Sequence, residues 1–501
     1  MLQGTASSVG KSLLVAALCR IFRQDGLSVA PFKAQNMSNN AAVTAGGGEI
    51  GRAQAVQAIA SGLDPHVDMN PILLKPETNH RSQVVVLGKA TEAMGAVDYY
   101  QRKQELWPVV SGALDRVRAD RDIVVIEGAG SPAEINLKAH DITNMRVARE
   151  TNAPVLLVGD IDRGGVFAHL VGTLELLEPE ERALVRGLII NKFRGDKSLL
   201  TDGLTFIEGR LGMPVVGVVP YMRDHAIPEE DSVALDQPQT SADKEALFDI
   251  VVVRLPHIAN TNDFEALAAE PSVRLRYASD PTSLGDPDLI ILPGSKSTID
   301  DLHHLRKRGL ADCIVRMAER GTQVLGVCGG YQILGGVIRD PEHVESPLDE
   351  SPGLGLLPIE TTFVANKITE QVAGRAAVTH GPMQVARTTQ AIGYEIHSGI
   401  STLTESAEPF FHLTQRSGQP IDQPDGAVNA HGNVYGTYMH GLFDEPDFRQ
   451  GFLTGLARAK GLADLPISTQ PSLDVMLDRL AAQVRANLDM GKVYSIVGLT
   501  E

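Results

Sequence analysis

Cysteine and aromatic residues are scarce in this sequence of 501 residues. Only three cysteines occur, and aromatic residues make up 5% of the chain. So few cysteines exclude a scaffold built on disulfides and fit a reducing compartment. None of the three stands in a Cys-x-x-Cys or Cys/His pattern with the spacing of a structural zinc site. The sequence therefore indicates a protein whose stability comes from a packed core.

Positive charge and long apolar runs are also lacking. The chain has 45 lysines and arginines against 62 aspartates and glutamates, which gives a formal net charge of −17. This excess argues against a nucleic-acid surface, because phosphate backbones require clustered cations. No apolar run reaches the roughly 18 residues of a membrane span, and the start has no signal-like segment. We expect a cytoplasmic protein without nucleic-acid or membrane partners; the sequence does not indicate its oligomeric state.

Short apolar runs alternate with helical patterns along the chain, which predicts an α/β protein. Runs such as 122–126 and 215–219 are typical of buried parallel strands, and a second series begins near residue 250. The polar stretch between the two series predicts a linker. The expected organisation is a first domain over 1–235, a linker over 236–247, a second α/β domain over 248–448 and a terminal segment over 449–501.

The terminal segment carries a single apolar stripe. Leu473, Leu477, Leu480, Val484 and Leu488 recur at helical spacing, which predicts an amphipathic helix. We expect this helix to pack on the second domain.

A glycine loop near the start predicts a phosphate site. "GTASSVGKS" covers residues 4–12 and has five residues between its glycines instead of the usual four. Backbone N–H groups of such a loop and the following helix bind phosphate oxygens. Lys11 would reach the β- and γ-phosphates, and the Ser12 hydroxyl would ligate Mg²⁺. The predicted ATP contacts of this loop are Gly4, Thr5, Gly10, Lys11 and Ser12. Only three residues precede the loop, so we expect its leading strand to be shortened or to begin upstream.

Further polar residues follow the predicted strands of the first domain. Glu127 ends a strand, where a carboxylate suits Mg²⁺, and Glu49 is a second metal candidate. Lys33 would neutralise a transferring phosphoryl group, and Asn191 stands where a nucleotide base is read. Asp160 and Asp162 are candidates for metal binding, substrate positioning or turn capping. The predicted substrate-binding residues are Gln35, Asn36, Arg52 and Asp141.

A cysteine on a sharp turn predicts a second chemical site. Gly326-x-Cys328-x-Gly330 follows an apolar run and precedes a helical pattern, as in a nucleophile elbow. At a helix start the thiol pKa falls and thiolate forms. The backbone N–H groups of Gly294, Ser295 and Gly329 are candidates for the oxyanion hole. His440 is the favoured base; the alternatives are His431, His397 and His380.

The motifs together resemble a known family. "GTASSVGKS", "VAPFKAQNMS", "EIGRAQ", "MNPILLKP", "IEGAGS", "GDIDRGGVFA", "GVCGGYQILG", "GYEIH" and "YGTYMHGLF" occur in the order found in cobyric acid synthases, and the resemblance covers nearly the whole chain. It implies a first domain like dethiobiotin synthetase, with a P-loop and a parallel sheet. It also implies a second domain like class I glutamine amidotransferases, with Cys328 as nucleophile and His440 as base.

The resemblance also implies a reaction. ATP and glutamine, with Mg²⁺, would amidate the b, d, e and g carboxylates of adenosylcobyrinic acid a,c-diamide to give adenosylcobyric acid in cobalamin biosynthesis. Class I relatives usually carry His-x-Glu, whereas this chain has His440-Gly441-Leu442, so the third catalytic group is unassigned and Glu395 is one candidate.

Three other functions stay open on the sequence alone. One is a sibling amidotransferase that acts on the a and c carboxylates. Another is a partitioning-type ATPase switch that binds protein partners. The third is a glutaminase-bearing scaffold with an inactive synthetase site.

Overall fold

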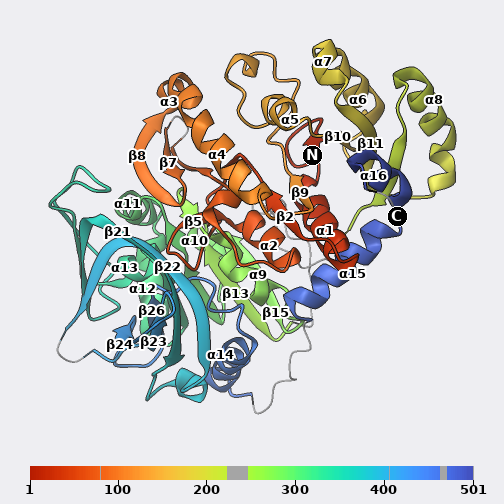
Figure 1. Ribbon diagram of the computed structural model, residues 1–501. Helices are drawn as coiled ribbons and strands as arrows, with labels where there is room; N and C mark the ends of the chain where they lie inside the picture. The colour runs from red at the N-terminus through yellow and green to blue at the C-terminus, as the bar shows by residue number, and fades with distance from the viewer. Residues whose placement is uncertain (79–80, 223–245, 405–406, 463–470, 500–501) are drawn as a thin grey trace. The chain divides into compact units, whose positions relative to one another are not determined.

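The computed structural model describes residues 1–78, 81–222, 246–404, 407–462 and 471–499, which form two compact units (Figure 1). The first unit contains Met1–Ser38, Glu49–Asp231 and Pro471–Glu501, and the second contains Asn39–Gly48 and Ser232–Gln470. The chain therefore crosses between the units more often than a single linker would require. Most of the predicted linker, 236–247, lies outside the described residues.

The first unit is built on a parallel sheet. Four strands lie in the order β1-β10-β11-β12, and β2 pairs with β9. A parallel bridge between Leu2 and Glu127 connects β1 to the end of β9. The strands are β1 (Leu2–Gly4), β2 (Val29–Phe32), β9 (Ile123–Ile126), β10 (Val155–Asp160), β11 (Val185–Phe193) and β12 (Val215–Pro220). The predicted parallel sheet is confirmed, and β1 is a strand of three residues.

Helices cover both faces of this sheet. Alternate residues of β10 belong to different apolar clusters: Leu156 and Val158 pack with α1, whereas Val155 and Leu157 pack with α4, α5 and α6. A sheet buried on both faces explains the near-continuous apolar runs in the sequence. The α-helices of this unit are α1 (Lys11–Gln24), α2 (Arg52–Ala60), α3 (Ala96–Arg102), α4 (Trp107–Arg118), α5 (Met145–Thr151), α6 (Val166–Glu175), α7 (Pro179–Arg182), α8 (Thr201–Leu211), α15 (Leu473–Arg485) and α16 (Met490–Val497).

A smaller sheet completes the first unit. Its order is β3-β6-β7-β8, with β3 parallel to β6 and the other pairs antiparallel. The strands are β3 (Gln35–Met37), β6 (Ile72–Thr78), β7 (Arg81–Val86) and β8 (Lys89–Gly95).

The terminal helix packs differently from the sequence expectation. Leu477 and Leu480 of α15 join the apolar cluster of α1 in the first unit. The Arg20 guanidinium of α1 also contacts Asp478 at 2.7 Å and Asp474 at 3.1 Å. The expectation that this helix packs on the second domain is therefore wrong. An apolar stripe shows that a helix packs on something, but the complementary surface on α1 lies more than 450 residues earlier in the chain.

The second unit is built on a second, mainly parallel sheet. Its order is β15-β13-β16-β18-β26-β25, and only the edge strand β25 runs antiparallel to its neighbour. The strands are β13 (Phe248–Val253), β15 (Val273–Ala278), β16 (Leu289–Leu292), β18 (Gln323–Val327), β25 (Ala427–Val428) and β26 (Val434–Thr437). The predicted second α/β domain is thus confirmed as to its fold class.

A sheet with two long strands packs into the same apolar core, and all its pairs are antiparallel except the parallel pair of β19 and β21. It has the order β20-β19-β21-β23-β24, with β22 also paired to β21. These strands are β19 (Val337–Arg339), β20 (Glu350–Pro352), β21 (Ile359–Ala376), β22 (Gln390–Leu403), β23 (Phe411–Arg416) and β24 (Gln419–Asp425). The other elements of the unit are β4 (Ala41–Val43), β14 (Ile258–Ala259), β17 (Gly294–Ser295), α9 (Glu265–Ala268), α10 (Pro281–Leu284), α11 (Thr298–Lys307), α12 (Leu310–Glu319), α13 (Gly329–Leu334) and α14 (Pro446–Ala459).

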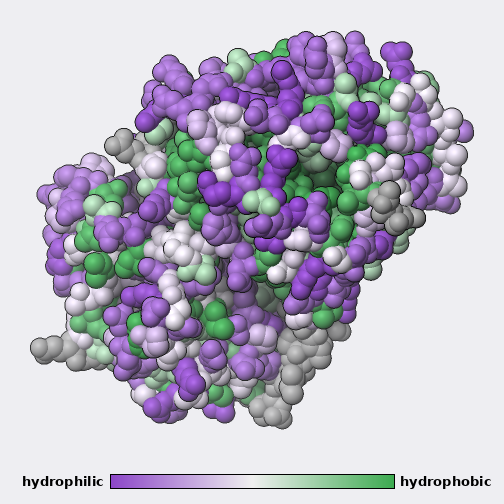
Figure 2. Space-filling model, viewed as in Figure 1, coloured by the Kyte–Doolittle hydropathy of each residue, from purple (hydrophilic) through white to green (hydrophobic). Residues whose placement is uncertain are grey.

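Exposed large hydrophobic residues are spread over several elements. Val97 lies on α3, Leu199 lies in the 3-10 helix Lys197–Leu200, and both Ile392 and Ile400 lie on β22. The face in Figure 2 accordingly mixes hydrophilic and hydrophobic residues. Among the described residues, no helix combines the length and the apolar character that crossing a membrane requires.

Candidate active sites

The glycine loop of the first unit connects β1 to α1 through two left-handed residues. Ser8 has a φ of 56° and Gly10 a φ of 90°, and α1 begins at Lys11. A Cβ atom on Gly4 would lie 2.7 Å from the Val9 side chain and 3.0 Å from Lys11 Nζ. Both glycines therefore let the backbone curl closely around the start of the helix. Free N–H groups at such a start bind phosphate.

Lys11 and two residues of β11 hold the loop in this shape. Lys11 Nζ lies 3.4 Å from the carbonyl oxygen of Gly130 and 3.5 Å from that of Ala6. Asn191 donates from Nδ2 to the Val9 carbonyl at 2.8 Å, and Lys192 donates to the loop as well. Asn191 Oδ1 is buried and has no hydrogen-bond partner among the described residues. This oxygen fits the acceptor role that the predicted base contact requires.

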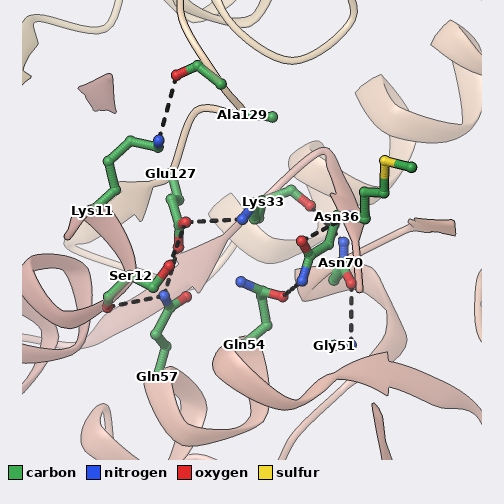
Figure 3. A network of polar contacts seen from close by, with 12 residues as sticks. Lys11, Ser12, Lys33, Asn36, Gly51, Gln54, Gln57, Asn70, Glu127 and Ala129 are labelled. Atoms are coloured by element: carbon green, nitrogen blue, oxygen red, sulfur yellow. Dashed lines mark hydrogen bonds and ion pairs between the residues drawn. The ribbon is translucent and has the colours of Figure 1, made fainter. Parts of the chain in front are cut away.

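Glu127 is the centre of a buried polar network beside the loop (Figure 3). Its carboxylate accepts hydrogen bonds from Ser12 Oγ at 2.8 Å, Lys33 Nζ at 2.9 Å and Gln57 Nε2 at 2.7 Å. Burial on its own raises the pKa of Glu127, but Lys33, Gln57 and Lys11 outweigh it and lower that pKa below its usual value. Glu127 is thus a charged carboxylate. The sequence analysis did not identify Gln57, which reaches Glu127 from α2.

The donor set at this network suits a hard divalent cation. A serine hydroxyl and a carboxylate oxygen 2.8 Å apart are oxygen ligands of the kind that Mg²⁺ prefers. Within the described part of the chain, no three His, Cys, Asp or Glu side chains cluster around a potential metal position. Ser12 and Glu127 would therefore supply part of a coordination sphere. The third predicted ligand, Glu49, instead forms a buried ion pair with Lys75 at 2.5 Å.

The predicted substrate residues have different surroundings. The Asn36 side chain donates to Gln54 at 2.8 Å, and the Gln35 side chain accepts from Tyr99. Arg52 begins α2. Asp141 accepts from three backbone N–H groups, those of residues 143, 144 and 146, and so it caps the turn into α5. Its place in the structure is that of a capping residue, and the substrate roles of all four stay predictions.

Two other acidic candidates of the first unit are paired with cations. Asp160 lies 3.3 Å from Lys192, and Asp162 lies 2.6 Å from Arg194. Asp160 Oδ1 also accepts the backbone N–H of Asp162 at 2.8 Å, which fits turn capping; the metal and substrate roles stay predictions.

The catalytic cysteine candidate of the second unit has the backbone of an elbow. Cys328 lies between β18 and α13 with φ 51° and ψ −107°, a conformation unfavourable for a residue with a side chain. A Cβ atom on Gly330 would collide with the Leu292 carbonyl. The strained turn leaves Cys328 at the first turn of a helix, where a thiolate is stabilised.

The predicted oxyanion residues meet beside this elbow. A Cβ atom on Gly329 would lie 2.8 Å from the backbone nitrogen of Ser295. A Cβ atom on Gly294 would lie 3.2 Å from His440 Cε1 and 3.9 Å from Cys328 Cβ. A side chain at Gly329 would therefore force the backbone to move, and one at Gly294 would be tightly packed. The fold brings together the groups that the sequence separates by more than 30 residues, and their oxyanion role stays a prediction.

His440 is the histidine that lies beside the cysteine, because a Cβ atom on Gly294 would be close to both side chains. Its ring stacks on Tyr394 at a centroid distance of 5.3 Å. Its Nδ1 lies 2.7 Å from Asp263 Oδ2, and both side chains are buried. Burial on its own lowers the pKa of His440, but Asp263 and Cys328 raise it, to about 10.

The alternative bases have other partners. His397 Nδ1 donates to the Gly399 carbonyl at 2.7 Å, and burial lowers the pKa of His397 to about 4. His380 pairs with Glu408 at 2.5 Å, and His431 is exposed. The structure therefore favours His440 over the other three.

The carboxylate that contacts His440 is not the one considered from the sequence. Glu395 contacts Arg416 at 2.9 Å, and burial raises the pKa of Glu395 to about 7. Asp263 contacts His440 instead. Asp263 follows a strand of the second sheet by ten residues, in "HIANTND", and only its position after an apolar run could have marked it.

Comparison with known proteins gives matches over both halves of the chain. Residues 1–233 match the CobQ/CobB/MinD/ParA nucleotide binding domain, and residues 249–448 match the CobB/CobQ-like glutamine amidotransferase domain. The chain is 53% identical to the cobyric acid synthase of Dehalococcoides mccartyi, over 99% of this chain and 98% of the relative. It is 51% identical to that of Pelotomaculum thermopropionicum over 100% and 96%, and 49% identical to that of Yersinia enterocolitica over 99% and 97%.

Proposed function

The chain belongs to the cobyric acid synthase family of ATP-dependent glutamine amidotransferases, and from this we propose its reaction. It amidates the b, d, e and g carboxylates of adenosylcobyrinic acid a,c-diamide and so forms adenosylcobyric acid. Glutamine supplies the nitrogen, and ATP supplies the energy. The observation that carries the proposal is the position of His440 beside Cys328 at a strained elbow, in a chain that also has a phosphate loop.

The first unit activates the acid. A carboxylate is a poor electrophile at neutral pH because its oxygen is a poor leaving group. The carboxylate oxygen attacks the γ-phosphorus of ATP, the bond to the β-phosphate oxygen breaks, and an acyl phosphate and ADP result. Lys11 and Lys33 neutralise the negative charge on the phosphoryl oxygens, which is the main contribution of protein to such a transfer. Ammonia then attacks the acyl carbon and displaces phosphate.

Mg²⁺ would be held by Ser12 and Glu127, and it supplies charge neutralisation at the phosphates when bound. Lys33 and Gln57 orient the Glu127 carboxylate by direct hydrogen bonds. A carboxylate held from several sides keeps its oxygens in place as the substrates change.

The second unit releases ammonia. The Cys328 thiolate attacks the side-chain amide carbon of glutamine, and N–H groups near Ser295 and Gly329 stabilise the oxyanion. The His440 imidazolium gives its proton to the leaving nitrogen, so that ammonia departs and a thioester remains. Water, deprotonated by His440, hydrolyses the thioester to glutamate and restores the thiolate.

The decisive experiment uses the purified full chain with ATP, glutamine and the a,c-diamide. Mass spectrometry should detect up to four successive amidations, each with loss of one phosphate from ATP. No product from the a,c-diamide, together with two amidations of a substrate whose a and c carboxylates are free, would identify the sibling enzyme. Failure to form any amide, with ATP hydrolysis stimulated by another protein, would favour the partitioning-type switch.

A further inference from the structure

A carboxylate from the beginning of the second unit contacts the candidate catalytic histidine. Asp263 belongs to a short 3-10 helix, Thr261–Phe264, and lies 177 residues before His440 in the chain. Its Oδ2 is 2.7 Å from His440 Nδ1, and its Oδ1 accepts from the Gly441 backbone N–H at 3.0 Å. We propose that Asp263 is the positioning residue of His440 and completes a set in the chain order Asp263, Cys328, His440. The proposal rests on the glutaminase function proposed above.

The two hydrogen bonds of Asp263 determine how His440 presents its ring. Nδ1 donates to the carboxylate, so Nε2 is the nitrogen left to exchange a proton with Cys328. The bond to Gly441 fixes the backbone that follows the histidine, where φ is 74°. A single carboxylate therefore sets the tautomer, the ring plane and the local backbone.

Apart from Cys328, the other groups around the ring do not supply a charge. Asn260 Nδ2 lies 3.4 Å from Nδ1 and 3.3 Å from Nε2, so it sits over the ring face. Tyr394 stacks on the ring. His397 is also near, but burial lowers its pKa to about 4, which leaves it neutral at pH 7. Among the described residues, Asp263 is the carboxylate that forms an ion pair with His440.

The buried position makes this carboxylate energetically important. The exposed fractions of the His440 and Asp263 side chains are 1% and 0%. Burying a protonated imidazole away from water costs free energy, and a negatively charged partner in contact with the ring offsets that cost. The imidazolium in turn lies beside the Cys328 sulfur, so removal of Asp263 should make this thiol less reactive toward electrophiles.

Asp263→Asn tests the proposal because asparagine has the same shape and can still accept the Gly441 N–H. We expect glutamine hydrolysis to fall about 10²- to 10⁴-fold in kcat, as loss of a tautomer-fixing carboxylate does in a comparable set. Ammonia-supported, ATP-dependent amidation should stay within about twofold of the unmodified enzyme. Glu270→Gln is the matched control, since Glu270 is also buried and forms an ion pair with Arg449 at 2.6 Å.

A second readout separates positioning from a merely structural effect. The rate of Cys328 alkylation by iodoacetamide is followed against pH, with the modified peptide identified by mass spectrometry. In Asp263→Asn the rate at pH 7 should fall at least tenfold below that of the unmodified enzyme, because the imidazole beside the sulfur is no longer held in its charged form.

A measurement on the unmodified protein covers the case in which the variant does not fold. Nitrogen-15 NMR of labelled histidine, with His440→Gln for assignment, should find both ring nitrogens of His440 protonated at pH 8. A neutral ring at that pH would overturn the inference. So would an Asp263→Asn enzyme with unchanged alkylation and hydrolysis, if Cys328→Ala is inactive with glutamine. Glutamine hydrolysis by Cys328→Ala would instead overturn the proposed function.

Discussion

The charged residues of both candidate sites are buried, and each depends on a partner of opposite charge. The Lys33 and Glu127 side chains are 4% and 0% exposed, and their ion pair has a length of 2.9 Å. A buried ion without its partner is costly, whereas a neutral pair of similar shape is tolerated. At the scale of the residue, the chemistry of each site is therefore tied to the stability of the unit that contains it.

Lys33→Met should destabilise the first unit because it leaves the Glu127 carboxylate buried without its main cation. We expect the free energy of unfolding to fall by about 3–5 kcal/mol, measured by urea unfolding. The double variant Lys33→Met/Glu127→Gln should recover most of this loss, although both variants should lose ATP-dependent amidation. Equal destabilisation by the single and double variants would contradict this explanation.

The same pair predicts how stability depends on acid. Because the pKa of Glu127 is lowered in the folded protein, its stabilising contribution is present above the ordinary glutamate pKa of about 4.3. That contribution is lost as the pH falls through the lower pKa of the folded state. The free energy of unfolding, measured with urea, should therefore fall less between pH 6 and pH 3 in Lys33→Met/Glu127→Gln than in the unmodified chain.

His440 predicts the alkaline limit of glutamine hydrolysis. The pKa of its imidazole is raised to about 10, so the proton that the leaving ammonia needs stays available well above neutrality. We expect kcat for glutamine hydrolysis to remain level to about pH 9 and to decline near pH 10. A decline near pH 6.5, the ordinary histidine value, would show that the imidazole is not held in its charged form.

Two segments of this fold contact residues that lie far from them in the sequence. The segment Asn39–Gly48 belongs to the second unit although both of its neighbours in the chain belong to the first. Asn40 Oδ1 accepts from the Thr261 backbone N–H at 3.0 Å and from the Thr261 hydroxyl at 3.2 Å. Thr261 begins the short helix that carries Asp263. The segment therefore supports the loop that holds the catalytic histidine.

Asn40→Ala should loosen this support without touching the reacting atoms. It leaves the buried Thr261 N–H without its acceptor, which costs about 1–3 kcal/mol. We expect kcat for glutamine hydrolysis to drop about 10-fold, measured by glutamate release, with ammonia-supported amidation less affected. Ala45→Ser, at an exposed position of the same segment, is the control and should match the unmodified enzyme.

The helix α15 is the other such element, and its core residues should stabilise the first unit. Leu480 is 2% exposed within the cluster that contains α1. Leu480→Ala should lower the free energy of unfolding by about 2–5 kcal/mol, as deletion of a buried leucine does elsewhere. Val475→Ala on the exposed side of the helix should change it by less than about 0.5 kcal/mol. Similar losses for the two variants would contradict the packing described here.

At the scale of the whole molecule, amide formation needs two reactions, the activation of an acid and the release of ammonia, and neither is sufficient alone. Free ammonia at neutral pH is mostly ammonium and does not attack, so an amide-forming enzyme benefits from releasing ammonia where it is used. The P-loop unit activates an acid but has no nitrogen source of its own, and the cysteine unit supplies nitrogen. Removal of the Cys328 nucleophile should therefore abolish the release of ammonia from glutamine but not the activation of the acid.

Cys328→Ala should abolish amidation with glutamine and leave amidation with high ammonium concentrations at alkaline pH. The expected loss with glutamine is at least about 10³-fold, because the nucleophile itself is absent. Product is measured by mass spectrometry with each nitrogen source. Cys313→Ala is the control, since Cys313 lies on α12 and is not part of the elbow. Loss of both activities in Cys328→Ala would contradict the separation of functions.

Much of this description could be predicted from local patterns. Apolar runs flanked by turns predicted two parallel sheets, because strands buried on both faces need continuous apolar residues. The glycine loop before Lys11 and the glycines around Cys328 predicted their sites, because such backbone turns are nearly impossible without glycine or strain. Each of these motifs spans no more than about a dozen residues, and over so short a range the local sequence determines the backbone geometry.

Tertiary structure decided which distant groups meet. Nothing near His440 in the sequence supplies a carboxylate, and Asp263 reaches it only because β13 and β26 lie in one sheet with the loops after them at the same end. Tertiary structure also decides that the apolar stripe of α15 packs on α1 rather than on the second unit, and that Gln57 contacts Glu127. The apolar periodicity of a helix predicts that one face is buried. Which surface buries that face depends on the packing and charge of segments elsewhere in the chain.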